Sequence, residues 1–391
     1  MRGGAALLRQ KGNPAMTWTR LLAASFCTLL ILGPQQFQSR IRAEQKTPES
    51  NLLQIEQQAE QLLAANRLRE AADLYRRALT THPAWKDGWW KLGTLAYDMD
   101  DFDECRTSLA RYLSLQPRDS SAWALKGLSE FELGERRQSL ADLQRADRLG
   151  MTEEGDLERV ANVHELLLLN AAGDFDKAFK LVQKLSGTDC TSQILIEGAG
   201  LTALRMTMLP KDLPKEREDL VLGAGRAVCN ATANHSAAAN TQFLGLIEQY
   251  PNEPQLHYLY ACFLLKDHPD EALSQLNAEL AISKTHVPAM TLVALEYLRR
   301  GQAAEALSYA QRAVAIAHRS AQAQFALGKC LIDLHRLQDG AAHLSEAARL
   351  APNDRQILWS LAAAYTQLGD QVAAQRVRRQ LTELDHAGEK N

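Results

Sequence analysis

The side chains that could bind a metal ion or attack a substrate include ten histidines and six cysteines. No two histidines have the H-E-x-x-H or the i, i+4 spacing that places two ligands on one helix face, and the cysteines contain no C-x-x-C pair. The sequence also lacks the G-x-x-x-x-G-K-[ST] pattern of phosphate-binding loops and the G-x-S-x-G pattern of serine hydrolases. We therefore expect no catalytic residue, no cofactor, no metal site and no enzymatic activity.

Two cysteines, Cys190 and Cys229, flank the least regular stretch of the chain. If this stretch is outside the cytoplasm, the oxidising environment would allow the two thiols to form a disulfide. Because connectivity cannot be deduced from sequence, their pairing is a hypothesis, and whether they are bonded stays open.

The overall charge of the 391-residue chain is close to balance, with a formal net charge of −3 at pH 7. A protein that binds nucleic acid normally presents a basic face to the phosphates, and this balance gives no sign of one. Hydrophobic residues make up 46% of the chain and charged residues 23%, which suits a folded helical protein. We expect a protein or an extended peptide as partner, and no nucleic acid.

Residues 1–44 look like a targeting segment. The apolar run Leu21–Leu32 contains 12 residues and follows Arg20. A run of this length falls within the roughly 7 to 15 residues of a signal-peptide core and short of the roughly 17 to 25 of a bilayer span. The segment is either a cleaved signal peptide or an uncleaved N-terminal membrane anchor, and Met16 is a possible true start. Both alternatives bring the N-terminal segment to a membrane and place residues 45 onward outside the cytoplasm, in the periplasm if the source is bacterial.

The rest of the chain is patterned as paired helices. Trp89, Leu92 and Gly93 recur at i, i+3 and i+4, which predicts an apolar stripe with a small residue where another helix comes close. A polar turn follows, and a second helix then runs to Pro117, which is 34 residues after Pro83. The unit is a helical hairpin with the period of a stacked helical repeat.

With W-x-x-L-G at Trp89–Gly93, D-F-D-E at Asp101–Glu104 and the closing Pro117, this hairpin resembles a tetratricopeptide repeat. The resemblance implies an all-α, right-handed superhelical solenoid of stacked hairpins, with the first helices on the concave side. About nine repeats fit the pattern between residues 52 and 388. We predict an N-terminal array over residues 45–186, an irregular helical insertion over 187–219, and a C-terminal array over 220–388. Within the insertion we expect a helix from Gln193 to Met208, which the prolines at 210 and 214 then break.

The resemblance also implies a partner-binding groove, because two positions of the first helix face the concave side in this family. Carrying these positions over gives aromatic residues in several repeats. In two of these repeats a lysine lies beside the aromatic residue and could bind a carboxylate of a partner. Aromatic side chains give large contact area with few rotors to freeze, although packing between neighbouring first helices is an equally good account of them. The predicted groove residues are Trp90, Lys91, Tyr97, Phe131, Tyr258, Phe325, Lys329 and Trp359.

These observations favour a non-enzymatic scaffold of the cell envelope or exported space that binds a protein or peptide in its groove. The alternative is a structural spacer or a regulatory subunit, which self-associates or contacts an enzyme through residues 187–219. A homo-oligomer is compatible with either function.

Overall fold

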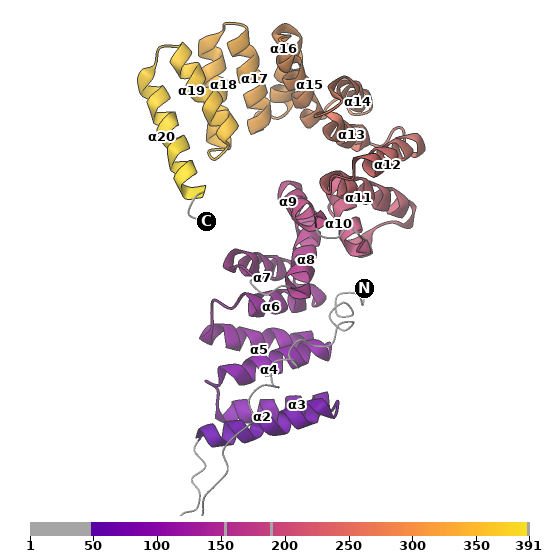
Figure 1. The fold of residues 1–391 in the computed structure, drawn as a ribbon, viewed down its shortest axis with the longest axis vertical. Coiled ribbons are helices and arrows are strands. Elements are labelled where there is room, and N and C mark those ends of the chain that lie inside the picture. Colours follow the sequence, from indigo (N-terminus) through magenta and orange to yellow (C-terminus); the bar gives the residue numbers. More distant parts are fainter. Residues whose placement is uncertain (1–47, 152–154, 188–190, 389–391) are drawn as a thin grey trace, which may run out of the picture. The chain divides into compact units, whose positions relative to one another are not determined.

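The computed structural model describes residues 48–151, 155–187 and 191–388. Over these residues the secondary structure is entirely helical, and successive helices pair side by side (Figure 1). The chain divides into two compact units after Pro214, and the residues of the predicted insertion therefore fall on both sides of this division.

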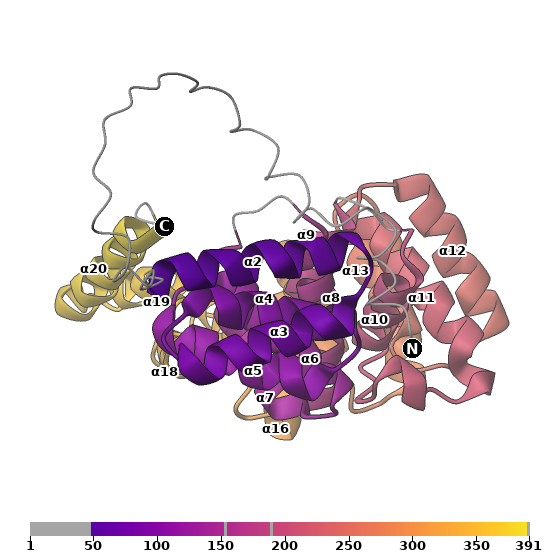
Figure 2. The same cartoon turned by 90° about the horizontal axis from the view of Figure 1, so that it is seen from below.

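The first unit contains four hairpins and one single helix. Figure 2 shows the first hairpin at the near end, with its two helices alongside each other. The helices are α2 (Pro48–Ala64), α3 (Leu68–Thr81), α4 (Lys86–Asp98), α5 (Phe102–Leu115), α6 (Ser120–Glu132), α7 (Arg136–Leu149), α8 (Asp156–Ala172), α9 (Phe175–Ser186), α10 (Gln193–Ala203) and the 3₁₀ helix η2 (Pro210–Asp212).

The second unit contains five hairpins, which follow one 3₁₀ helix. Its elements are η3 (Lys215–Arg217), α11 (Glu218–Thr232), α12 (Ser236–Gln249), α13 (Leu256–Leu264), α14 (Pro269–Ile282), α15 (Val287–Arg299), α16 (Ala303–Ile316), α17 (Ala321–Asp333), α18 (Leu337–Leu350), α19 (Arg355–Gln367) and α20 (Gln371–Gly388). The described residues thus form nine hairpins and one unpaired helix, which confirms the predicted solenoid of about nine repeats with one irregular insertion.

Each of several hairpins is held together where a glycine of its first helix meets a leucine of its second. A Cβ atom built at Gly93 of α4 would lie 2.8 Å from the side chain of Leu109 on α5, which is fully buried. A side chain at this position would have to displace Leu109, so the predicted role of Gly93 as a small residue at a close helix contact is confirmed. The same pairing recurs as Gly127 with Leu143 and as Gly328 with Leu344.

The fourth residue of several first helices ties its helix to the preceding loop. The indole N–H of Trp89 donates a hydrogen bond to the carbonyl oxygen of Pro83 at 2.9 Å. The bond satisfies an indole donor and a loop carbonyl, and it holds the first helix against the loop before it. The same six-residue link joins Trp123 to Pro117 and Gln324 to His318, and it joins His257, the second residue of α13, to Pro251.

The turn within almost every hairpin contains one residue in the left-handed region. Asp100 has φ 60° between α4 and α5, and Gly134 has φ 80° between α6 and α7. Glycine, asparagine and aspartate tolerate this conformation best, which explains the turn composition. The turn between α13 and α14 contains no such residue, and its four residues, 265–268, make it one residue longer than the turn between α4 and α5. The left-handed turn residues are Asn66, Asp100, Gly134, Gly173, Asn234, Gly301, His335 and Gly369.

The irregular segment differs from its prediction in one respect. The sequence predicts a helix from Gln193 to Met208, but α10 ends at Ala203, because Arg205 turns into the left-handed region with φ 51°. The chain then runs back over earlier turns: the Arg205 guanidinium lies 4.9 Å from the ring of Phe175, and Asp212 pairs with Arg136 at 3.4 Å. Because α10 packs against α8 and α9, it corresponds to the first helix of a repeat that has no second α-helix.

The predicted targeting segment and Cys190 lie outside the described residues, so the leader, its cleavage and the proposed disulfide stay predictions. Cys229 is buried in α11. Among the helices described, none is both long and apolar enough to span a bilayer.

Candidate partner-binding surface

All eight predicted groove residues lie on first helices of hairpins, four in the first unit and four in the second. The side of each unit that its first helices form is here called the first-helix surface. In the first unit Trp90 is half-buried on α4, and its ring lies 5.3 Å from that of Tyr112 on α5. Lys91 beside it is partly exposed. Because Trp89 belongs to the apolar stripe, the sequence predicts that it is buried between helices, but it is also only half-buried. Trp90 therefore combines a packing contact with a surface that a partner could still reach.

Two further predicted residues of the first unit offer less surface. Tyr97 is 6% exposed and packs edge-to-face on Phe102, with ring centroids 5.7 Å apart. Its burial raises the pKa of the Tyr97 hydroxyl, with smaller contributions from nearby carboxylates such as Glu132. Phe131 is half-buried and meets His164 of α8 edge-to-face at 4.7 Å. Both rings contribute mainly to packing between helices.

The predicted groove residues of the second unit also include both buried and exposed side chains. Phe325 of α17 is 2% exposed. Tyr258 of α13 is half-buried, with its ring 4.9 Å from that of His286, and its backbone N–H donates to the buried carboxylate of Glu279 at 3.3 Å. Lys329 is partly exposed, and Trp359 of α19 is 62% exposed. Tyr97 and Phe325 are therefore buried, and the predicted residues that remain at least partly accessible are Trp90, Lys91, Phe131, Tyr258, Lys329 and Trp359.

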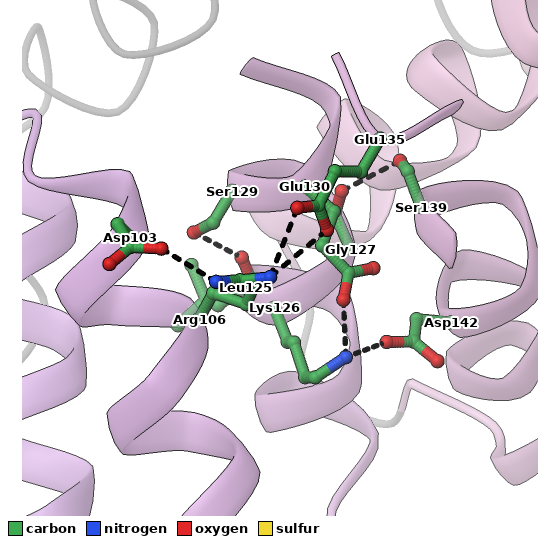
Figure 3. Close-up of polar contacts among 10 residues, drawn as sticks. All are labelled: Asp103, Arg106, Leu125, Lys126, Gly127, Ser129, Glu130, Glu135, Ser139 and Asp142. Atoms are coloured by element: carbon green, nitrogen blue, oxygen red, sulfur yellow. Dashed lines mark hydrogen bonds and ion pairs between the residues drawn. The ribbon is translucent and has the colours of Figure 1, made fainter. Parts of the chain in front are cut away.

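A buried ionic network in the α6–α7 hairpin was not predicted from the sequence (Figure 3). The ammonium group of Lys126 donates to the carboxylate of Glu130 on the same helix and to that of Asp142 on α7. The Glu130 side chain is 3% exposed, and its second oxygen is buried without a hydrogen-bond partner among the described residues. The residues at the same places one repeat earlier are Leu92, Ala96 and Ser108.

The electrostatics of this network follow from its burial and its charge count. One ammonium group serves two carboxylates, so the network has a net negative charge when all three groups are ionised. Burial first, and the charge of Asp142 in addition, raise the pKa of Glu130 to about 7. The sequence signal for the network is the replacement of apolar core residues by Lys126 and Glu130, which becomes visible once repeats are aligned.

A second ionic group borders this network at the turns of the hairpins. Arg106 of α5 donates to Asp103 at 2.6 Å and to Glu135, just before α7, at 3.0 Å (Figure 3). The Ser139 hydroxyl donates to the carbonyl oxygen of Gly127 at 2.7 Å, which joins α6 to α7. These contacts connect neighbouring helices, and within the described residues no group of three or more His, Cys, Asp or Glu side chains is arranged to hold a metal ion.

Two solved structures are similar to part of this chain. A crystal structure of MamA has 16% sequence identity and a TM-score of 0.38, and the match covers 42% of this chain and 97% of that one. MamA 41-end from Desulfovibrio magneticus RS-1 has 18% identity and a TM-score of 0.39, covering 42% of this chain and 94% of that one. Likeness at this level carries no information about what the chain binds. No curated protein matches the sequence.

Family models give the more direct result. Residues 62–128 match one model of the tetratricopeptide repeat, and residues 293–355 match another. The first match covers helices of the first unit and the second match covers helices of the second unit. Each unit of this chain therefore contains a segment that matches a tetratricopeptide-repeat model.

Proposed function

We propose that the chain is a non-enzymatic scaffold that binds a protein or an extended peptide on its first-helix surface. The observation that supports this most is that a half-buried tryptophan and a partly exposed lysine are neighbours on a first helix of the first unit. Trp90 offers a broad apolar contact, and Lys91 offers a charge for a carboxylate of the partner. Tryptophan is enriched among the residues that dominate protein interfaces. Tetratricopeptide repeats in both units supply a rigid support for such a surface.

The proposal is tested by photo-crosslinking in cells. A photoreactive amino acid is placed at Lys91 or at Lys329 on the first-helix surface, and at Leu115 or Ile316 on the second helices as matched controls. The control side chains are 41% and 47% exposed. We expect discrete adducts with a partner protein from the two first-helix positions, and loss of the position-91 adduct when Trp90→Ala is added. Equal adducts from the control positions, or adducts that Trp90→Ala leaves unchanged, would contradict the proposal.

We further propose that the repeats act outside the cytoplasm. This rests on the apolar run Leu21–Leu32 and the basic residues before it. Fractionation of cells that express the full chain, followed by protease treatment of intact and opened compartments, measures where the repeats are. Digestion of the repeats only when the cytoplasm itself is opened would refute an exported location.

A further inference from the structure

The last hairpin of the second unit exposes an aromatic residue that its predecessor buries. Phe325 of α17 is 2% exposed because it packs in one cluster with Ile357 and Leu358 of the following helix, α19. Trp359 occupies the corresponding place in α19 one repeat later, but no described helix follows α20, and Trp359 is 62% exposed. The position that is covered on α17 is therefore exposed on α19 among the described residues.

Polar side chains surround this open position. Ala321 and Ile332 of α17 pack on the same cluster as Phe325, whereas their counterparts on α19 are Arg355 and Thr366. The counterparts form polar contacts within the last hairpin: Arg355 pairs with Asp385 at 2.9 Å, and Arg378 donates to the Thr366 hydroxyl at 2.9 Å. Protein interfaces often have a large aromatic residue at the centre and polar residues around it. Trp359 and its polar neighbours have this arrangement.

We propose that this end surface, formed by Trp359, Arg355, Thr366, Arg378 and Asp385, binds a second copy of this chain through the same surface about a two-fold axis. The position of Trp359 is one that packs against a helical hairpin elsewhere in the chain, so another such hairpin is the occupant that fits. A two-fold contact is self-complementary, buries two Trp359 rings together and stops at two copies.

Charge supports the same arrangement. Arg378 and Asp385 are exposed and stand two turns apart on one face of α20. If two copies of α20 cross antiparallel with the axis between these residues, Arg378 of each copy faces Asp385 of the other. Opposite charges placed in this way fix register and favour the correct partner.

A head-to-tail contact would instead place Trp359 of one copy against α2 of the next. The residues of α19 that pack in one cluster with Phe325 include Ile357 and Leu358, and their counterparts on α2 are Gln54 and Ile55. Repetition of such a contact would produce filaments, whereas the two-fold contact between last hairpins is closed.

The test measures the mass of the full chain in solution by light scattering and sedimentation, with a reducing agent present. We expect a concentration-dependent dimer, and at least a tenfold weaker dimer for Trp359→Arg. The matched control is Leu244→Arg on α12, where the leucine is 49% exposed, and it should leave the dimer unchanged. Circular dichroism of each variant checks that the helices remain folded.

A charge-exchange experiment tests the axis itself. In a dimer of Arg378→Asp, the new aspartate of each copy faces Asp385 of the other, and the two acidic groups repel. In a dimer of Asp385→Arg, the new arginine faces Arg378 in the same way. Each variant should therefore dimerise at least tenfold more weakly. Mixing the two variants restores opposite charges on both sides of the axis and should restore a mixed dimer.

Several outcomes would overturn the inference. A monomer at every concentration would exclude self-association, and growth beyond a dimer would replace the two-fold contact by a head-to-tail one. Failure of the mixed variants to pair would exclude the proposed axis. None of these results bears on the crosslinks expected at Lys91, so failure of this inference is distinguishable from failure of the proposed function.

Discussion

At the scale of single residues, the contact between Gly93 and Leu109 shows how one missing side chain positions two helices. Leu109 is fully buried, and any side chain at position 93 must compete with it for the same volume. Gly245 of α12 is the matched contrast, because a Cβ atom built there meets nothing within 4 Å. The two glycines have the same chemistry, but only Gly93 is required by packing.

Gly93→Leu should destabilise the first unit, and Gly245→Leu should slightly stabilise the second. Overpacking a core costs about 1 to 3 kcal/mol, whereas replacing an exposed helical glycine by a good helix former contributes about 0.8 kcal/mol. The measurement is the urea unfolding of each full-length variant, with hydrogen exchange to locate the change in α4 and α5. A Gly93→Leu variant as stable as the wild type would show that the hairpin can open without loss.

How far residue roles follow from sequence depends on what each position contacts. The role of Gly93 is predictable because its partner, Leu109, belongs to the same hairpin and stands at a fixed spacing. The exposure of Phe325 and Trp359 is not predictable from either helix alone. Both occupy the same place in the repeat, but Phe325 is buried by contacts with the following helix α19, whereas Trp359 is exposed among the described residues.

At the scale of elements, the α6–α7 hairpin replaces part of its apolar core by the network of Lys126, Glu130 and Asp142. A buried ion pair contributes little net stability, because desolvation of the charges offsets their attraction. Removing one member, however, leaves buried charges without a partner. The preceding repeat carries apolar or small residues at these places and packs without a network, so a natural replacement is available within the chain.

Lys126→Leu alone should destabilise the first unit by about 3 kcal/mol, because two carboxylates then share a buried site without a cation. The triple variant Lys126→Leu, Glu130→Ala and Asp142→Ser copies the preceding repeat and should be at least as stable as the wild type. Thermal and urea unfolding of the three proteins provides the comparison. If the triple variant were the least stable of them, the network would be a net source of stability and this account would be wrong.

The position of α10 illustrates what the sequence could and could not indicate for whole elements. The prolines at 210 and 214 indicate a break, and the structure has only short 3₁₀ helices there. The earlier end of α10 depends on Arg205, whose left-handed conformation is accompanied by contact with Phe175 of another hairpin. Contacts between segments distant in sequence leave no periodic pattern, so the boundary was predicted too late.

At the scale of the whole molecule, the two units differ in their buried acids. In the first unit, burial raises the pKa of Glu130 to about 7, and burial together with the charge of Asp147 raises that of Glu165 to about 7. In the second unit the carboxyls with a shifted pKa, Glu296 and Glu346, shift downward because arginines hydrogen-bond to them. The two units should therefore respond differently to pH.

The first unit should become more stable as the pH falls from 8 to 6. For Glu130 and Glu165 the folded pKa, about 7, exceeds the ordinary value of 4.5. Such a group contributes stability that is complete below the unfolded pKa and is lost as the pH rises through the folded one. The free energy of unfolding should increase by about 1 kcal/mol per carboxyl over this range.

Tryptophan fluorescence during urea unfolding can measure this change in the first unit, since four described tryptophans belong to it. Trp359→Phe removes the described tryptophan of the second unit from the signal. Glu130→Gln and Glu165→Gln should each reduce the pH dependence, and an unchanged dependence in the double variant would contradict the assignment. The four reporters are Trp85, Trp89, Trp90 and Trp123.

The missing partner of α10 also affects the order in which the chain can fold. In a stack of hairpins each element gains stability only from its neighbours, so folding can start at any hairpin and spread along the chain. Contacts between adjacent hairpins close short loops, which favours fast nucleation in either unit. After α10 the next element is not a second α-helix, and residues 204–217 supply only short 3₁₀ helices. We therefore expect the propagation of helical structure to pause at these residues. During synthesis, the first unit would then fold outside the ribosome while the second unit is still being translated.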